Sequence, residues 1–378
     1  MDAPGVWRER GRKARCCKGG VIKKYKIALI PGDGIGTEVV PEGVKVLTAA
    51  GRRFGFVFEW DSRPWGCQFY LQTGAMMPPD GLTEIQHHDA IYLGAVGFPG
   101  VPDDVSLWGL LIRIRRQFDQ YVCLRPIRLM PNVQSPLRDC IPGDIDIMLV
   151  RENTEGEYSD RGRKLHEGSP EEVVIQENIF TRKGVDRILR YAFELARTRE
   201  DKRLTSATKS NGIAIAMPYW DSRFALMAQQ YPDIHADQYH IDILAAHFVQ
   251  RPGRFDVVVG SNLFGDILSD LGSACAGTIG IAPSANLNPA REYPSMFEPV
   301  HGSAPDIFGR NIANPIGQIW SGAMMLEHLG QPDAARAIVT AIQSVLSNGP
   351  RTRDLGGHAS TQEVGSAIAD TVTNMTVG

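Results

Sequence analysis

The chain has 378 residues, of which 43% are hydrophobic and 22% are charged, and its formal net charge at pH 7 is −3. This composition is ordinary for a globular protein, and the length favours two domains or one large one. The charge balance offers no basic field for a nucleic acid, and no apolar run approaches the length of a membrane span. We therefore expect neither a nucleic-acid nor a membrane partner. The six cysteines form no C-x-x-C pair, which predicts a reducing compartment without a disulfide framework.

The first residues differ from the rest of the chain. Residues 1–24 are basic and lack a long apolar segment, so they do not read as a secretory signal. They also contain acidic residues, which argues against a transit peptide. We expect a disordered basic extension, with a basic interaction tail as the alternative.

A glycine-rich turn follows the first apolar run. Residues 26–38 read KIALIPGDGIGTE, the outline of a strand, a turn and a helix. The dinucleotide fingerprint G-x-G-x-x-G would need its third glycine one residue after Gly36. Asp33 would also place a negative charge beside a phosphate, although Glu59 lies at a suitable distance for a ribose-binding acid. The motif alone is compatible with a dinucleotide loop or with a tight turn between strand and helix.

Apolar runs of strand length alternate with helix-like segments along the chain. Strands are expected at 26–30, 56–60, 90–96, 146–150, 171–178, 203–209 and 255–262. Helices are expected at 38–50, 182–198, 218–230, 264–272, 319–328 and 363–372. This alternation predicts an α/β architecture with a largely covered sheet. No low-complexity linker interrupts it, so two domains would share a sheet or exchange the chain.

Three arginines are candidates for binding an anionic substrate. Arg115 and Arg125 lie in LLIRIRRQFDQYVCLRPIRL, and Arg151 follows the predicted strand 146–150. Ligands of open α/β sheets collect at the carboxyl ends of the strands, and the planar guanidinium group grips carboxylates with two donors. The three residues predict a substrate with several carboxylates; the alternative is that they are surface charges.

Two further segments carry candidate site residues. Lys209 comes just after the apolar part of the strand predicted at 203–209, where desolvation would let it act as a base; the alternative is a solvated loop lysine. Residues 301–315 read HGSAPDIFGRNIANP, a loop rich in Gly and Pro that offers backbone N–H groups and Asp306 to a ligand.

A pair of aspartates predicts a metal site. Asp266 and Asp270 are four residues apart on the helix expected after Asn262, so both face one side. Like charges at this spacing are unfavourable, and a hard divalent cation such as Mg²⁺ or Mn²⁺ offsets the repulsion. Their apolar neighbours predict that this helix is buried; the alternative is two solvated acids. Asp242, which alternates with His240 as on a strand, is a candidate third carboxylate.

The segments GDGIG, LRP, NLFGDILSDL, FEPVHGSAPDI and IANP, in this order, resemble the β-decarboxylating dehydrogenases, the isocitrate and 3-isopropylmalate dehydrogenase family. The resemblance extends from about Lys26 to the C-terminus. SLWGLL, RRQFDQYVCLRP, ATKSNG and ACAGTIGIAPSANLNP are most similar to the tartrate and D-malate dehydrogenase branch. The resemblance implies the two-domain isopropylmalate-dehydrogenase-like fold, which is not a Rossmann fold. A discontinuous large cofactor-binding domain (25–120 and 277–378) would accompany a small domain (121–276) with the dimer interface and metal ligands.

This resemblance implies a homodimer with shared active sites and a role for each matching residue. Metal ligands would be Asp266 and Asp270 of one subunit and the partner subunit's Asp242. Tyr158 would protonate the enol intermediate, and the partner subunit's Lys209 would serve the 2-hydroxyl group. Substrate contacts would be Arg115, Arg125, Arg151, Leu111 and Trp108. Cofactor contacts would be His301, Asp306, Ile307, Asn314 and Asn211, so that the turn at 32–36 is not the dinucleotide loop.

The implied activity is the NAD-dependent oxidation, with decarboxylation, of a small D-2-hydroxy diacid in the cytoplasm. The substrate would be D-malate, giving pyruvate and CO₂, or tartrate, with Mg²⁺ or Mn²⁺ as the metal and K⁺ as a further activator. Trp108 stands where 3-isopropylmalate dehydrogenases commonly have glutamate. Gly109 and Leu111 replace the serine and asparagine common in isocitrate dehydrogenases. The alternatives are 3-isopropylmalate dehydrogenase and, from another class, a non-catalytic regulatory subunit.

Overall fold

The computed structural model describes residues 22–375 and leaves residues 1–21 and 376–378 outside the described part. Most of the predicted extension 1–24 therefore lies outside the described residues. Lys23 and Lys24 already belong to the first strand, so this strand begins slightly earlier than the sequence predicted. No helix in the described part is both long and apolar enough to span a bilayer.

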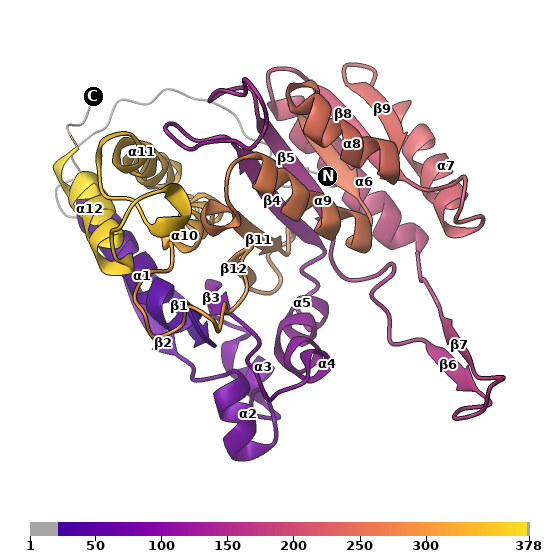
Figure 1. Ribbon diagram of the computed structural model, residues 1–378, viewed down its shortest axis with the longest axis horizontal. Coiled ribbons are helices and arrows are strands. Elements are labelled where there is room, and N and C mark those ends of the chain that lie inside the picture. Colours follow the sequence, from indigo (N-terminus) through magenta and orange to yellow (C-terminus); the bar gives the residue numbers. More distant parts are fainter. Residues whose placement is uncertain (1–21, 376–378) are drawn as a thin grey trace.

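A mixed sheet of ten strands runs through the molecule in the order β2-β1-β3-β12-β11-β4-β5-β10-β8-β9 (Figure 1). The strands on both flanks pair in parallel, whereas the β12–β11, β11–β4 and β4–β5 pairs at the centre are antiparallel. The strands of this sheet are β1 (Lys23–Gly32), β2 (Phe56–Ser62), β3 (Ala90–Ala95), β4 (Val122–Arg128), β5 (Asp146–Glu152), β8 (Arg203–Thr208), β9 (His235–His240), β10 (Val257–Gly260), β11 (Pro283–Leu287) and β12 (Ser295–Pro299).

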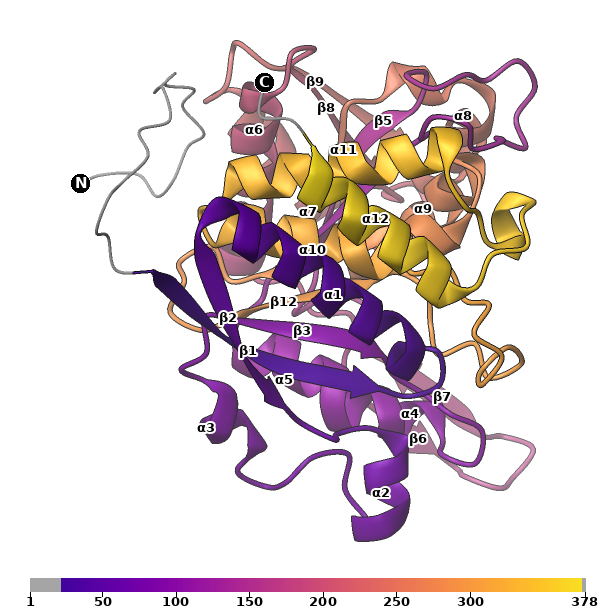
Figure 2. The ribbon, with the colours of Figure 1, turned by 90° about the vertical axis from the view of Figure 1, so that its left-hand side faces the viewer.

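Helices cover both faces of this sheet. Figure 2 shows α1, α10, α11 and α12 on one face of β1 and β3, with α2, α4 and α5 on the other. The α-helices are α1 (Gly36–Phe54), α2 (Cys67–Thr73), α3 (Gly81–Ile85), α4 (Asp103–Ser106), α5 (Ile112–Gln117), α6 (Arg182–Thr198), α7 (Ala216–Ala228), α8 (Ile241–Gln250), α9 (Asn262–Cys275), α10 (Ile316–His328), α11 (Pro332–Asn348) and α12 (Thr361–Asn374). A π-helix, η1 (Leu107–Leu111), joins α4 to α5, and 3-10 turns lie at η2 (Pro252–Arg254), η3 (Ile279–Ile281) and η4 (Arg353–Leu355).

Most of the predicted elements are confirmed, and helix 182–198 has the predicted bounds. The strands β4, β9, β11 and β12, a short strand at Gly162–Leu165, and the helices α2, α3, α4, α5, α8 and α11 were not predicted. The interpretation of His240 and Asp242 as alternating strand residues is wrong, because β9 ends at His240 and Asp242 lies in the first turn of α8. A carboxylate is favoured there by the partial positive charge of the helix N-terminus.

The turn at 32–36 is held by protein groups. The carboxylate of the buried Asp33 accepts hydrogen bonds from the backbone N–H groups of Cys67 and Gly97, at 2.7 and 2.9 Å. A Cβ atom at Gly34 would lie 2.1 Å from the carbonyl oxygen of Ser303, so only glycine allows this approach. The turn thus fixes neighbouring loops, among them the start of the 301–315 segment.

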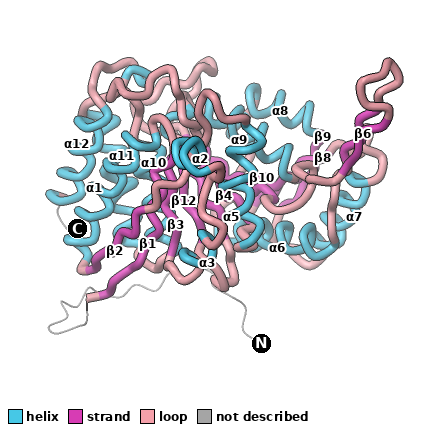
Figure 3. Tube along the Cα trace, turned by 90° about the horizontal axis from the view of Figure 1, so that it is seen from below, coloured by secondary structure: helices cyan, strands magenta, loops and turns pink. Residues whose placement is uncertain are grey.

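A separate two-stranded hairpin projects from the body of the molecule. Its strands are β6 (Gly162–Leu165) and β7 (Val173–Gln176), which pair only with each other in the described part. Figure 3 places this hairpin at the opposite end of the molecule from α1 and α12. Val173 and Val174 are exposed on it. An isolated two-stranded hairpin is only marginally stable in water and usually needs further strands or a packed face. Within the described residues this hairpin has no further strand.

Candidate active site

Two arginines of adjacent strands meet Asp266 of helix α9. Arg125 and Arg151 both donate to Oδ1 of Asp266, and the Arg125 Nη1–Oδ1 distance is 3.1 Å. The register pairs Cys123 of β4 with Arg151 of β5. Since side chains alternate along a strand, Arg125 lies on the same face of the sheet as Cys123 and Arg151. The two arginines are 7% and 2% exposed, so their charges lie almost out of solvent and need this carboxylate.

The hydroxyl group of Tyr158 completes this cluster. It donates a 2.7 Å hydrogen bond to Oδ2 of Asp266, and the Arg151 guanidinium lies 5.4 Å from the tyrosine ring centroid. Partial burial and the hydrogen bond to Asp266 raise the pKa of Tyr158, so the hydroxyl keeps its proton at neutral pH. Burial acts to raise the pKa of Asp266, but the positive charges of Arg151 and Arg125 outweigh it, and the pKa of this carboxyl lies below its usual range.

Arg115 of α5 is held by a buried carboxylate that the sequence did not single out. Its Nη2 atom donates to Oε1 of Glu298 on β12 at 2.7 Å, and both side chains are 8% exposed. Asn286 of β11 donates to the same oxygen at 2.6 Å. The Nε atom of Arg115 is buried and has no hydrogen-bond partner among the described residues, so one donor remains for a ligand.

Other supporting residues were also missed by the sequence interpretation. Asn262 accepts from Nε and Nη2 of Arg151 at 3.1 and 2.6 Å, and Ser269 accepts from Arg125. Their position on the helix of Asp266 was the available clue. Glu298 had a clue of another kind, because it is an acid in the otherwise apolar run SMFEPV.

The aspartates proposed as metal ligands are only partly brought together. Asp270 lies one turn after Asp266 on α9 and is exposed. The prediction that this helix is buried holds for one face only, because Ile267 is 50% exposed. Between residues 22 and 375, no three Asp, Glu, His or Cys side chains gather as a metal site. Oxygen donors suit Mg²⁺ or Mn²⁺, so Asp266 and Asp270 fit such an ion, and a third carboxylate would have to come from outside the described part of this chain.

Asp242 and Lys209 form a separate pair. The Lys209 Nζ–Asp242 Oδ1 distance is 2.9 Å, and their side chains are 30% and 66% exposed. Lys209 follows β8, as predicted, and Asn211 is exposed in the same loop. In the described chain these three residues make no hydrogen bond or ion pair with Arg115, Arg125, Arg151, Tyr158 or Asp266.

In the predicted cofactor loop, some polar atoms have hydrogen-bond partners within the protein and others do not. The Nδ1 atom of His301 contacts the carbonyl oxygen of Gly302 at 2.9 Å, whereas Nε2 is buried without a partner in the described part of the chain. Burial lowers the pKa of His301, so the ring is neutral at pH 7. Asp306 is exposed, and Ile307 beside it is half-buried. A free imidazole nitrogen and an exposed carboxylate fit the adenosine part of a dinucleotide.

Asn314 has structural partners instead. Its Oδ1 atom accepts from the N–H of Ile316 in the first turn of α10 at 3.0 Å, and its Nδ2 atom donates to Asp354 at 2.9 Å. The loop itself is anchored by Glu38 of α1, whose two carboxylate oxygens accept from the N–H groups of Gly309 and Asn311 at 2.6 and 3.1 Å. These bonds give the loop a defined backbone before any ligand binds.

Trp108 and Leu111 lie on the π-helix η1, and both are half-buried. Isolated π-helical turns are rare and occur frequently at functional sites. The Arg116 guanidinium lies 4.6 Å from the Trp108 ring centroid. A Cβ atom at Gly109 would lie 2.7 Å from Cγ of Met76, so a larger residue there would have to displace Met76 or this turn.

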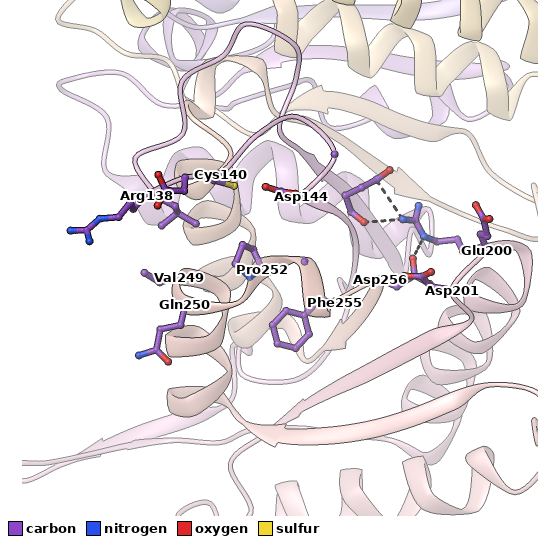
Figure 4. Close-up of a pocket in the computed structure, with 16 residues that line it drawn as sticks. Arg138, Cys140, Asp144, Glu200, Asp201, Val249, Gln250, Pro252, Phe255 and Asp256 are labelled. Carbon is purple, nitrogen blue, oxygen red and sulfur yellow. Dashed lines mark hydrogen bonds and ion pairs between the residues drawn. The ribbon is translucent and has the colours of Figure 1, made fainter.

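A cavity of 650 Å³ lies elsewhere, between the loop of Arg138 and Cys140 and the segment that leads from α8 to β10 (Figure 4). None of its lining residues is a predicted site residue. Asp256, one of its acids, is bonded to Arg199. This cavity is therefore separate from the cluster of predicted substrate residues.

Comparisons with known proteins agree with the motifs. Residues 26–368 match the family described as isocitrate/isopropylmalate dehydrogenase. The chain is 61% identical over 355 residues to D-malate dehydrogenase [decarboxylating] of Escherichia coli (strain K12), covering 92% of this chain and 98% of that protein. It is 60% identical over 359 residues to tartrate dehydrogenase/decarboxylase of Pseudomonas putida, covering 93% and 98%.

A solved structure is similar over the same length. The isocitrate dehydrogenase from Methylococcus capsulatus superposes with a TM-score of 0.84 at 35% identity, covering 93% of this chain and 100% of that one. The predicted isopropylmalate-dehydrogenase-like α/β fold is thereby confirmed. The chain belongs to the isocitrate/isopropylmalate dehydrogenase family.

Proposed function

We propose that this protein oxidises and decarboxylates a small D-2-hydroxy diacid, D-malate or tartrate, with NAD as the hydride acceptor and Mg²⁺ or Mn²⁺ as the metal. The observation that carries the proposal is the cluster of two buried arginines and a protonated tyrosine around Asp266, in a chain about 60% identical to enzymes named for these substrates. The same relatives disfavour 3-isopropylmalate dehydrogenase and a non-catalytic subunit.

The arginines bind and orient the diacid. Arg115 has a free buried Nε donor, and Arg125 and Arg151 now donate to Asp266. A guanidinium group has five N–H donors, so each can hold a substrate carboxylate while keeping some of its protein contacts. Glu298 and Asn262 keep the planes of Arg115 and Arg151 fixed, which favours one substrate orientation.

Two residues move protons. Lys209 of the partner subunit takes the proton of the 2-hydroxyl group, and Tyr158 donates its proton to C3 after CO₂ has left. The raised pKa of Tyr158 keeps the proton available until that step. A divalent cation bound by Asp266, Asp270 and the partner subunit's Asp242 would acidify the 2-hydroxyl group and stabilise negative charge. NAD bound along 301–314 would accept the hydride from C2.

The order of the strands supports two domains. Five neighbouring strands, β2, β1, β3, β12 and β11, come from the segments 25–120 and 277–378, apart from the first residues of β1. The other five, β4, β5, β10, β8 and β9, come from 121–276. The sheet thus has a single boundary between the two sets of strands, between β11 and β4, and Arg125 lies on β4 at this boundary.

Exposed apolar groups support a homodimer with shared sites. Val174 on the β6–β7 hairpin is 65% exposed, and Ile243 and Val249 on α8 and Ile267 on α9 are at least 44% exposed. A second copy would cover these faces and give the hairpin the additional strands it lacks. The exposed pair of Lys209 and Asp242 lies in the same half of the chain, available to a partner's site. The free thiols of Cys67, Cys123, Cys140 and Cys275 support a cytoplasmic location.

The test is a turnover assay with the purified full chain, Mn²⁺ and NAD, which measures NADH absorbance and the release of pyruvate or CO₂. D-Malate or a tartrate isomer should be the best substrate, and chelation of the metal should abolish turnover. NADP should be used poorly, since the exposed Asp306 would repel its 2′-phosphate. A wild-type preference for 3-isopropylmalate or isocitrate would overturn the substrate assignment, and equal kcat/KM for the two cofactors would overturn the choice of NAD.

A further inference from the structure

Arg116 follows the substrate arginine Arg115 in sequence, but its side chain has different partners. Its Nη2 atom donates a 2.5 Å hydrogen bond to the backbone carbonyl oxygen of Tyr158. Its guanidinium carbon also lies 4.6 Å from the centroid of the Trp108 ring. One side chain on α5 therefore contacts both the π-helix and the loop that follows β5.

The loop of Tyr158 is also fixed through Glu157, the residue that precedes Tyr158. The carboxylate of Glu157 accepts from Oγ of Ser261 at 2.6 Å and from the N–H of Leu263 at 3.1 Å, at the start of α9. Helix α9 carries Asp266, the acceptor of the Tyr158 hydroxyl group. The backbone of this loop is thus fixed to α9 through Glu157 and to α5 through Arg116.

The chemistry of arginine suits both contacts at once. The guanidinium face can stack on an indole ring while the N–H groups in its plane donate to a carbonyl oxygen. Lysine offers a point charge and could serve one contact but not the planar arrangement of both. Loss of Arg116 would free the Trp108 ring and the Tyr158 carbonyl together.

We propose that Arg116 is a positioning residue that fixes Tyr158 for proton transfer to C3 and, with the same group, holds Trp108 as the wall that limits substrate size. The inference rests on the proposed function, in which Tyr158 is the proton donor. It assigns to Arg116 no contact with the substrate: its effect on the rate passes through Tyr158, and its effect on substrate choice passes through Trp108.

The test is a double-mutant cycle in the full-length enzyme, with kcat for D-malate measured in Arg116→Gln, Tyr158→Phe and the double variant. Displacement of a reacting group by 1 Å can cost about 100-fold, so Arg116→Gln should lower kcat by about 10- to 100-fold. In the Tyr158→Phe background the same change should have almost no further effect. Equal losses in both backgrounds would show a merely structural role and overturn the proposal, as would unchanged kcat in the single variant.

A second readout is the ratio of kcat/KM for D-malate to kcat/KM for 3-isopropylmalate. Arg116→Gln should lower this ratio, and it should lower it much less when Trp108 is already alanine; an unchanged ratio refutes the link to Trp108. Arg113→Gln is the matched control, because Arg113 lies on the same helix and, among residues 22–375, donates only to the carbonyl oxygen of Pro79, at 3.2 Å. Its kcat and ratio should match the wild type.

Thermal melting establishes that each variant is folded, and Arg116→Lys replaces Arg116→Gln in the cycle if the latter does not fold. Failure of the underlying function gives a different result. A wild-type enzyme inactive on D-malate and tartrate, or a Tyr158→Phe variant with full kcat, refutes the proposed role of the site and the Arg116 proposal with it. If Tyr158→Phe is weakly active but Arg116→Gln lowers kcat equally in the wild-type and Tyr158→Phe backgrounds, the proposed role of Arg116 is refuted and that of Tyr158 is not.

Discussion

Replacing Trp108 with alanine should open the substrate pocket to 3-isopropylmalate. The indole is half-buried on the π-helix η1, and the Arg116 guanidinium restrains its ring. In the wild type an isopropyl group would have to displace this ring. Overpacking typically costs about 1–3 kcal/mol, and a lost cation–π contact at a partly exposed site costs about 0.5–1 kcal/mol. The sum, about 1.5–4 kcal/mol, corresponds to a kcat/KM about 10- to 900-fold lower for 3-isopropylmalate than for D-malate.

The assay is kcat/KM for both substrates, at saturating NAD and Mn²⁺, in the wild type and in Trp108→Ala. The gap should narrow in the variant, mainly through a gain on the larger substrate, because D-malate has no group that the indole excludes. Leu107→Ala is the matched control, since Leu107 lies on the same π-helix and is 36% exposed. Its substrate ratio should equal that of the wild type.

Three results would refute this reasoning. An unchanged ratio in Trp108→Ala would remove the indole from the substrate pocket. A wild-type preference for 3-isopropylmalate would show that the pocket accommodates the isopropyl group without displacing anything. A loss of D-malate activity with no gain on 3-isopropylmalate would assign Trp108 to the folding of η1 instead of to selection by size.

Further predictions concern the subunits, the buried charges and pH. Lys209→Ala and Asp270→Asn homodimers should each lose about 10²- to 10⁴-fold in kcat, whereas a purified mixed dimer should regain about half the wild-type activity; mixed dimers as inactive as the parents would place both residues in one chain. Glu298→Ala should lower the free energy of unfolding, measured in urea, by about 3–5 kcal/mol, because it leaves the buried Arg115 without its carboxylate partner. Glu59→Ala removes an exposed ion pair and should lower the free energy of unfolding by less than about 1 kcal/mol. Equal losses in the two variants would contradict the role of burial. Burial raises the pKa of Glu152 from 4.5 to about 7. The folded state therefore binds this proton more tightly than the unfolded state, and the resulting contribution to the free energy of unfolding is complete below pH 4.5 and is lost as the pH rises through 7. Glu152→Gln should therefore gain stability relative to the wild type between pH 5 and pH 8, by up to about 3 kcal/mol, and a pH-independent difference in urea unfolding would refute this.

The parts of the fold that the sequence predicted have strong local patterns. Helix α6 repeats apolar residues at helical spacing and begins after Thr181, whose side chain accepts from the N–H of Gly184. The aspartates of α9 are four residues apart, so their shared side of the helix follows from geometry alone. Two of the missed strands lack such patterns. β9 reads HADQYH, a polar strand at the edge of the sheet, and β11 reads PSANL, which begins with proline and contains a buried asparagine.

The supporting residues of the site could not be predicted, because their partners are distant in sequence. Glu298 and Arg115 are 183 positions apart, and they meet only because β12, β11 and β4 are neighbours in the sheet. The antiparallel register places Glu298 opposite Ser284, which brings Asn286 to the same carboxylate. A single sequence shows the residue types that chemistry requires, but it does not show which of them pair across strands.

Several charged side chains of the candidate site are already paired with one another within the single chain, and this pairing constrains how a substrate can bind. Asp266 accepts from Arg125, Arg151 and Tyr158, while Asp242 is held by Lys209. An unpaired charge at the buried positions of Arg125 and Arg151 would cost several kcal/mol, so their pairs with Asp266 stabilise the site. A diacid that takes over the Nη1 donors of Arg125 and Arg151 replaces Asp266 as their acceptor, and Asp266 then needs a new positive partner. A divalent cation bound at Asp266, as proposed above, would supply that charge, so the diacid and the cation are expected to favour each other's binding. The same carboxylate that keeps the arginines in place before binding is therefore suited to hold the metal afterwards.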